Sequence, residues 1–300
     1  MTLPTRPVLR YHGGKWRLAA WIIRHFPPHR IYTEAFGGAA SVLMQKPRAY
    51  AEVYNDRWDA VVNVFRVLRD PARAAELEHR LRLTPYARTE FEQSGIGDVD
   101  LTDPVEAARR TILRSFAGFG SAAINAKHAT GFRANSNRSG TTPAHDWASY
   151  PDQITAFTNR LTGIVIENRP AVEVLQQHDS PDTLHYVDPP YVHSTRELRA
   201  AKGRAIYAYE MTDAEHRELA DVLHRMRGMV VLSGYWSPFY GELYDTWVCI
   251  ERASFADGAR PRTECLWLSP RTTERLVQPS LFVNEVPVST TPPTRGGACT

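Results

Sequence analysis

The first 70 residues alternate segments typical of strands with segments typical of helices. Strand-like runs lie at 31–38 ("IYTEAFGG") and 49–56 ("AYAEVYND"). Helix-like apolar spacing occurs at 15–26, 39–46 and 57–70. This order is typical of a doubly wound α/β fold built on a mostly parallel sheet. In such sheets ligands bind beyond the carboxyl ends of the strands, so the chemistry is expected there.

The alternation stops after residue 70 and returns near residue 161. The stretch between is helical at first and then becomes rich in Gly, Ser, Thr and Asn from 118 to 147, which predicts long ordered loops. Later segments predict strands at 163–168, 183–190, 229–235, 246–251 and 263–269, and helices at 171–178 and 212–226, the latter with a Thr212–Glu215 capping box. We therefore predict one discontinuous catalytic domain (1–70 and 161–276), an insertion (71–160) and a disordered tail (277–300).

Charge and cysteine content narrow the class of protein. The net charge is only +3, but six Lys/Arg and one acid lie between 109 and 150, and four Lys/Arg and one acid between 192 and 208. Such clusters can attract phosphates, and they can equally form a solvated basic face. Cys249 and Cys265 lie in strand-like runs, which favours inert core positions, and the three cysteines form no CxxC pair, which fits a reducing cytoplasm. No apolar run is long enough to cross a bilayer, so no membrane contact is expected.

Two glycine-containing segments could approach a ligand closely. Gly37 and Gly38 follow the first strand, and Asp56 ends the next strand about 20 residues later, the spacing at which an acid binds ribose hydroxyls. A plain turn is the simpler alternative, and the complete dinucleotide fingerprint is missing. "YHGGK" (11–15) is not a P-loop, but its backbone amides and Lys15 could hold a small carboxylate or phosphate.

The most informative motif is "DPPY" at 188–191, directly after an apolar strand. The Asp188 carboxylate and the Pro189 carbonyl can both accept hydrogen bonds from one exocyclic amine, and Tyr191 can stack on the ring that bears it. This suits methyl transfer from a sulfonium to a poor amine nucleophile such as adenine N6, with no covalent nucleophile or metal. The structural alternative is an Asx-Pro turn that ends a strand.

The motifs "YHGGKWRL", "YTEAFGGAASVL", "YND" and "DPPY", in this order, resemble the Dam-type (alpha-group) site-specific DNA adenine-N6 methyltransferases over about residues 8–270. The resemblance implies a class I methyltransferase sheet with an antiparallel last strand and an inserted helical target-recognition region. It implies catalytic roles for Asp188, Pro189, Pro190 and Tyr191. It implies S-adenosylmethionine binding by Tyr11, Gly13, Gly14, Lys15, Glu34, Phe36, Gly37, Gly38, Asp56, Asn168 and Asp188.

The resemblance also implies duplex DNA as the partner, a monomeric enzyme and a target base taken out of the stack. The expected phosphate contacts come from the insertion and from the loop after "DPPY": Arg114, Lys127, Arg133, Arg138, Arg196 and Arg199. Two alternatives stay open at this point. Cytosine-N4 methylation uses a similar exocyclic amine, and the chain could be a non-catalytic DNA-binding protein on the same scaffold.

Overall fold

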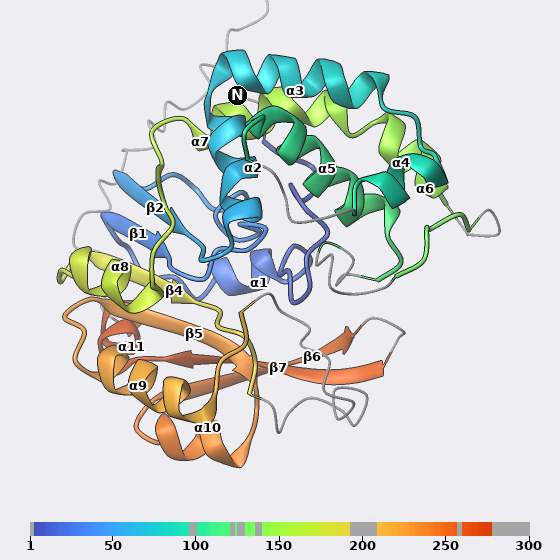
Figure 1. Cartoon of the computed structure of the whole chain (residues 1–300). Coiled ribbons are helices and arrows are strands. Elements are labelled where there is room, and N and C mark those ends of the chain that lie inside the picture. Colours follow the sequence, from blue (N-terminus) through green and yellow to red (C-terminus); the bar gives the residue numbers. More distant parts are fainter. Residues whose placement is uncertain are drawn as a thin grey trace, which may run out of the picture.

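The computed structural model of the chain describes residues 3–95, 101–120, 124, 130–135, 140–192, 209–256 and 260–277. In this part a seven-stranded sheet has the order β3-β2-β1-β4-β5-β7-β6 (Figure 1). The strands are β1 Ile31–Glu34, β2 Ala51–Asn55, β3 Val165–Glu167, β4 Thr183–Val187, β5 Met229–Tyr235, β6 Val248–Ala256 and β7 Arg260–Leu268. Strands β1 to β5 are parallel, and β7 is antiparallel to both β5 and β6. The parallel α/β sheet and its antiparallel last strand are thus confirmed.

Helices cover both faces of this sheet. They are α1 Ala19–Ile23, α2 Asp59–Arg69, α3 Pro71–Leu83, α4 Arg88–Gln93, α5 Pro104–Ala117, α6 Pro143–Ala148, α7 Ile154–Leu161, α8 Ala171–Gln177, α9 Asp213–His224, α10 Pro238–Leu243 and α11 Pro270–Val277, with a 3-10 turn at Pro151–Gln153. Alternate residues of β5 enter two apolar clusters: Val231 packs with the α2 and α5 side, and Val230 packs with the α8, α9 and α10 side. The molecule is therefore a three-layer α/β structure (Figure 1).

The predicted insertion packs directly against α2, a helix that covers the sheet. Phe65 of α2, Ile112 of α5 and Phe157 of α7 are all fully buried in one cluster. The indole N–H of Trp147 donates to the carbonyl of Thr84 at 2.8 Å, which ties α6 to the end of α3. Residues 71–160 therefore share a core with the sheet layer, and their separate role in target recognition stays a prediction.

One predicted helix is absent. Residues 39–46 form successive turns instead of the predicted helix. Ala40 has a left-handed backbone, with φ 51°, and the amide of Leu43 donates at 2.9 Å to the carboxylate of Glu34. The amides of Met44 and Lys46 still bind carbonyls four residues earlier, but the Gln45 amide binds only three residues back and the Leu43 amide binds Glu34, so helical bonding is interrupted in this segment. By contrast, α9 begins with the predicted capping box of Thr212 and Glu215.

The predictions for the cysteines and the C-terminal segment are confirmed only in part. Cys265 is buried in β7 as predicted, but Cys249 on the edge strand β6 is exposed, which corrects its assignment to the core. The polypeptide continues as helix α11 up to Val277, and the predicted tail from 278 to 300 lies outside the described residues. Within the described ranges, no helix has the length and apolarity needed to cross a bilayer.

A buried ion cluster joins α7 to the sheet. Glu52 of β2 contacts Arg160 Nη1 and Lys46 Nζ, each at 2.6 Å, and all three side chains are at most 3% exposed. Burial alone would raise the pKa of Glu52, but the hydrogen bonds from Arg160 and Lys46 lower this pKa overall. The carboxylate is therefore held ionised between two buried cations.

Removing this carboxylate should strongly destabilise the fold. Glu52→Ala leaves two buried cations without their anion, and breaking a buried pair in this way costs about 3–5 kcal/mol of unfolding free energy. Glu78→Ala is the matched control, because Glu78 pairs with Arg82 at the surface, at 2.8 Å. Urea denaturation should show a large loss for Glu52→Ala and almost none for Glu78→Ala. Similar small losses for both variants would contradict this view of the cluster.

Candidate active site

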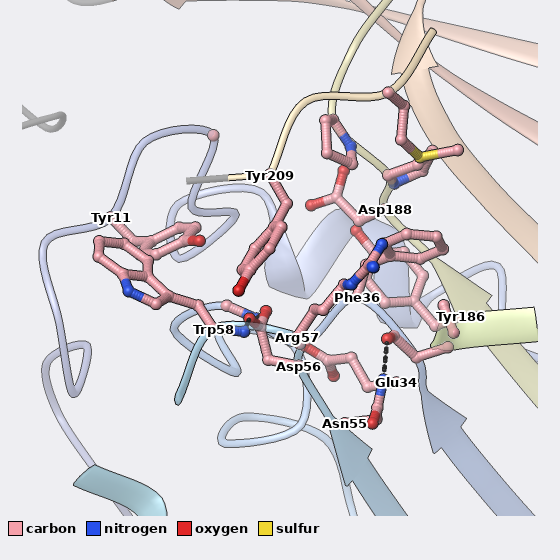
Figure 2. Close-up of a pocket in the computed structure, with 18 of the residues that line it drawn as sticks. Tyr11, Glu34, Phe36, Asn55, Asp56, Arg57, Trp58, Tyr186, Asp188 and Tyr209 are labelled. Carbon is pink, nitrogen blue, oxygen red and sulfur yellow. Dashed lines mark hydrogen bonds between the residues drawn. The ribbon is translucent and has the colours of Figure 1, made fainter. Parts of the chain in front are cut away.

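Several segments meet at the carboxyl edge of the sheet and line one cavity (Figure 2). They are the loops after β1, β2, β3 and β4, the N-terminal loop at 11–15 and the residues that lead into α9. Parallel pairing of β1 with both β2 and β4 brings their ends together. Of the sequence-predicted residues, the cavity is lined by Tyr11, Gly13, Gly14, Lys15, Glu34, Phe36, Gly37, Gly38, Asp56, Asp188, Pro189 and Pro190. Two predicted residues, Asn168 and Tyr191, do not line it.

The loop after β1 depends on two glycines. A Cβ on Gly37 would lie 2.2 Å from the ring of Tyr54 and 2.8 Å from the carbonyl of Asn55, so no side chain fits there. Gly38 has φ +46°, and a Cβ there would lie 2.9 Å from the Tyr11 ring. The Tyr54 hydroxyl also donates to the Gly38 carbonyl at 2.8 Å. These glycines therefore let the backbone pack tightly at the floor of the cavity.

Asp56 is fixed by backbone amides. Its Oδ2 accepts from Gly38 N and its Oδ1 from Trp58 N, both at 2.8 Å. Burial raises the pKa of Asp56, and these amides oppose that shift only in part. Each carboxylate oxygen can accept a further hydrogen bond, so Asp56 can still bind a hydroxyl group.

Two asparagines hold the neighbouring turns. Asn168 donates from Nδ2 to the main-chain carbonyl of Asp56 at 3.0 Å, which places it behind the cavity wall. Asn55, which the sequence reasoning missed, donates to the carbonyl of Ala35 at 2.8 Å and accepts from the amide of Arg169 at 2.9 Å. It therefore joins the loops after β1, β2 and β3. Its place in "YND", just before Asp56, was the available signal.

The carboxylate of Asp188 has two firm partners. Lys15 Nζ lies 3.0 Å from its Oδ2, and the hydroxyl of Ser233 donates to its Oδ1 at 2.6 Å. Lys15 is only 4% exposed and also donates to the carbonyl of Gly13 at 2.6 Å. The resemblance implied that Lys15 binds S-adenosylmethionine, and the structure shows Lys15 joining the N-terminal loop to the "DPPY" turn.

Tyr191 is anchored away from the cavity. Its hydroxyl donates to Glu264 Oε2 at 3.0 Å, and the Lys15 ammonium lies 4.8 Å from the centre of its ring. Tyr235 packs edge-on against the same ring at 4.5 Å. In this arrangement Tyr191 supports the "DPPY" turn, and its stacking on a target base stays a prediction.

Several cavity residues were missed from the sequence. Arg57 and Trp58 directly follow Asp56, so their position next to a predicted site residue could have identified them. Tyr209 and Met211 precede α9, where the sequence carries no motif. Figure 2 shows Tyr209 among the side chains around the pocket, with the guanidinium of Arg57 5.1 Å from its ring centre.

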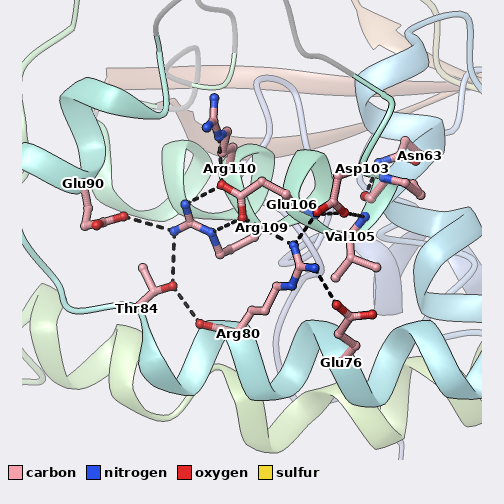
Figure 3. A network of polar contacts seen from close by, with 11 residues as sticks. Asn63, Glu76, Arg80, Thr84, Glu90, Asp103, Val105, Glu106, Arg109 and Arg110 are labelled. Atoms are coloured by element: carbon pink, nitrogen blue, oxygen red, sulfur yellow. Dashed lines mark hydrogen bonds and ion pairs between the residues drawn. The ribbon is translucent and has the colours of Figure 1, made fainter.

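Two arginines of α5 are paired with acids of the same insertion. Arg109 contacts Glu106 at 2.7 Å and Glu90 at 3.1 Å, and Arg110 contacts Glu106 at 2.9 Å (Figure 3). The acids come from α4 and from the start of α5, outside the window in which the surplus of positive charge was counted. The charge of the α5 surface is therefore lower than the sequence window suggested.

The predicted DNA contacts have little support from the described residues. Arg114 is 8% exposed with its guanidinium against Phe91, and Arg133 lies 3.6 Å from Asp146. Neither side chain offers much surface to a phosphate in this arrangement. The other four predicted contacts lie outside the described residues: Lys127, Arg138, Arg196 and Arg199. All six stay predictions.

Metal-capable side chains gather at a different place. The ligand atoms of Cys249, Glu251 and Cys265 lie within 4.8 Å of one another on β6 and β7. None of these residues lines the cavity at the carboxyl edge. These three residues therefore lie apart from the cavity at the carboxyl edge.

Glu34 is the most perturbed acid of the site. Its Oε2 accepts from the Tyr32 hydroxyl at 2.7 Å and from the Leu43 amide at 2.9 Å. Burial raises the pKa of Glu34 to about 8, and the negative charge of Asp188 acts in the same direction. In the folded protein Glu34 is therefore mostly protonated at neutral pH.

This protonation predicts a pH dependence of stability. The folded protein keeps the Glu34 proton up to about pH 8, whereas the ordinary pKa is 4.5. Between these values the native state binds more protons than the unfolded state, so stability falls as pH rises, by up to ~1.4 kcal/mol per pH unit. Glu34→Gln removes this contribution. In urea denaturation from pH 5.5 to 8.5, the unfolding free energy of the variant should rise steadily relative to that of the wild type.

A control separates this effect from the general pH response. Glu173 is exposed, and Glu173→Gln should follow the wild-type profile at every pH. Parallel profiles for wild type and Glu34→Gln would show that Glu34 is ionised in the folded protein.

Comparison with known proteins adds one finding. The family described as D12 class N6 adenine-specific DNA methyltransferase matches residues 11–254, which is more than half of the chain. A search of curated proteins found no match.

Proposed function

The chain belongs to the D12 class of N6 adenine-specific DNA methyltransferases, and on this premise we propose that methyl transfer takes place in the cavity at the carboxyl edge of the sheet. The family methylates the N6 amine of adenine in DNA. The observation that supports this location is the shared cavity itself. Asp188 and Pro189 of the "DPPY" turn face the same space as Gly37, Gly38 and Asp56.

The family implies S-adenosylmethionine as the methyl donor, and the residues of the cavity fit this molecule. Gly37 and Gly38 let the loop after β1 pack closely against Tyr54 and Tyr11, which shapes the cavity wall, and Asp56 keeps acceptor capacity for ribose hydroxyls. Lys15 pairs with Asp188 and also acts on the carboxyl group of Glu264, which places these three side chains together at one end of the site. When bound, S-adenosylmethionine supplies an electrophilic methyl group on a sulfonium.

The "DPPY" turn would hold the target amine. Asp188 Oδ2 can accept a second hydrogen bond besides that from Lys15. Pro189 has no N–H and a restricted φ, so its carbonyl is a second acceptor on a stiff turn. Two acceptors orient the amine for in-line attack, and the carboxylate offsets the positive charge that develops on nitrogen.

The target base would have to leave the DNA stack. The Asp188 side chain is 18% exposed at the rim of the cavity, where a base inside an intact duplex cannot reach it. Enzymes that modify a base solve this problem by flipping it into a pocket. Recognition of a specific duplex sequence by residues 71–160, and a monomeric state, belong to the same proposal. Of the earlier alternatives, cytosine-N4 methylation and a non-catalytic scaffold have no observation in their favour.

The charge of Asp188 should be essential for catalysis. Asp188→Asn keeps the shape and one acceptor oxygen but removes the negative charge, so methyl transfer should slow at least ~100-fold. Asp182→Asn, at the other end of the same strand, is the control, because Asp182 is exposed and outside the cavity. Transfer of radiolabelled methyl to duplex DNA, followed by nucleoside mass spectrometry, measures both rate and product. Full activity of Asp188→Asn would remove its charge from the mechanism.

Asp56 should contribute to cofactor affinity. Asp56→Asn keeps one acceptor for the surrounding amides but loses the charge, and S-adenosylmethionine binding should weaken by ~1.5–3 kcal/mol. Asp59→Asn, at the exposed start of α2, should bind normally. Calorimetric titration of the folded variants tests this. An unchanged Kd for Asp56→Asn would place the ribose elsewhere.

A further inference from the structure

A serine of β5 lies beside the carboxylate at the tip of β4. Val187 of β4 is paired with Leu232 of β5 in the parallel register, so the residues that follow them, Asp188 and Ser233, are neighbours. The hydroxyl of Ser233 donates to Asp188 Oδ1 at 2.6 Å, and Ser233 is 1% exposed. Water therefore has little access to compete for this hydrogen bond.

The direction of the hydrogen bonds around Ser233 follows from counting protons. Asp188 is paired with Lys15 and, as a carboxylate, only accepts hydrogen bonds. The Ser233 hydroxyl has one proton, and it donates this proton in the hydrogen bond to Asp188. The contact between Tyr186 Oη and Ser233 Oγ, at 3.1 Å, must then use the proton of Tyr186. The result is a directed chain from Tyr186 through Ser233 to Asp188, in which each donor strengthens the next bond.

We propose that Ser233 is a positioning residue for methyl transfer, which fixes the Asp188 carboxylate so that Oδ2 is the oxygen presented to the target amine. This inference rests on the proposed function and extends it to a residue outside the cavity wall and outside the "DPPY" motif. Without Ser233, the carboxylate can turn about its terminal torsion, which is broad for aspartate. A misplacement of about 1 Å can slow an enzyme ~100-fold.

The orientation also explains how Lys15 and the amine can share one carboxylate. Oδ1 is held by Ser233, and Oδ2 lies toward Lys15 at 3.0 Å. An oxygen of a carboxylate can accept two hydrogen bonds, so Oδ2 can receive the amine while the ammonium stays in place. Lys15 then stays paired with the carboxylate, and Ser233 keeps it aligned.

The first test compares two buried serines. Ser115 of α5 is fully buried and donates to the Ile112 carbonyl at 2.8 Å, so Ser115→Ala loses a similar hydrogen bond far from the site. Ser233→Ala should lower kcat about 10- to 100-fold while the KM for DNA and the Kd for S-adenosylmethionine stay unchanged. Ser115→Ala should keep the wild-type kcat. A kcat within twofold of wild type for folded Ser233→Ala would overturn the proposal.

The second test asks whether Ser233 acts through Asp188. In the Asp188→Asn background, Ser233→Ala should slow the reaction by a much smaller factor than in the wild-type background. The reason is that Ser233 acts through the Asp188 carboxylate, which the first substitution has already removed. An equal factor in both backgrounds would overturn the proposal. Ser233→Thr keeps the hydroxyl and should recover most of the rate. If Ser233→Ala does not fold, Ser233→Cys replaces it, because a thiol donates only weakly and should also lose rate.

The outcomes separate this inference from the proposed function. Absence of methyl transfer to DNA by the wild-type protein would overturn the proposed function. An active wild type with a slow Asp188→Asn and a normal Ser233→Ala would leave the proposed function standing and overturn only the role of Ser233.

Discussion

The contact between Gly37 and the end of β2 determines the geometry of the whole site. The amide of Gly37 donates to the carbonyl of Asn55 at 2.7 Å, and the Tyr54 ring leaves no room for a Cβ. This contact brings Gly38 within reach of Asp56, and Gly38 in turn lies against the Tyr11 ring. The loops after β1 and β2 and the N-terminal loop are thus positioned by one point of backbone contact. Asn55 extends the same support to the loop after β3.

The electrostatics of the site follow from its buried acids. Glu34, Asp188 and Glu264 come from three different strands or their ends, and burial raises the pKa of Glu34 and of Glu264. Hydroxyl groups stabilise this crowding, because Tyr32 donates to Glu34 and Tyr191 donates to Glu264. One acid can stay protonated while Asp188 is paired with Lys15. The site therefore combines one carboxyl group that is paired with a cation and two whose pKa is raised by burial.

Much of this could be predicted from the sequence, because strand patterns and short motifs are local. The succession of strands along the chain follows from periodicity, the capping box of α9 from its local motif, and the clustering of Asp56 with Asp188 from the rule that ligands bind at the carboxyl edge. The roles of Ser233 and Asn55 could not be read in this way, since they depend on the register between strands. The turns at 39–46 were missed because Glu34, a residue of the preceding strand, binds the Leu43 amide. Arg109 was counted as free charge because its partner Glu90 lies on another helix.

The shared core between α2 and the helices at 71–160 has a consequence for how such an enzyme can diverge. Phe65, Ile112 and Phe157 interlock, so the outer face of α2 is shaped to these helices. A foreign segment inserted between residues 70 and 161 would meet a mismatched surface and would have to be accompanied by changes in α2 itself. The helical part is therefore poorly suited to exchange by recombination as an independent cassette.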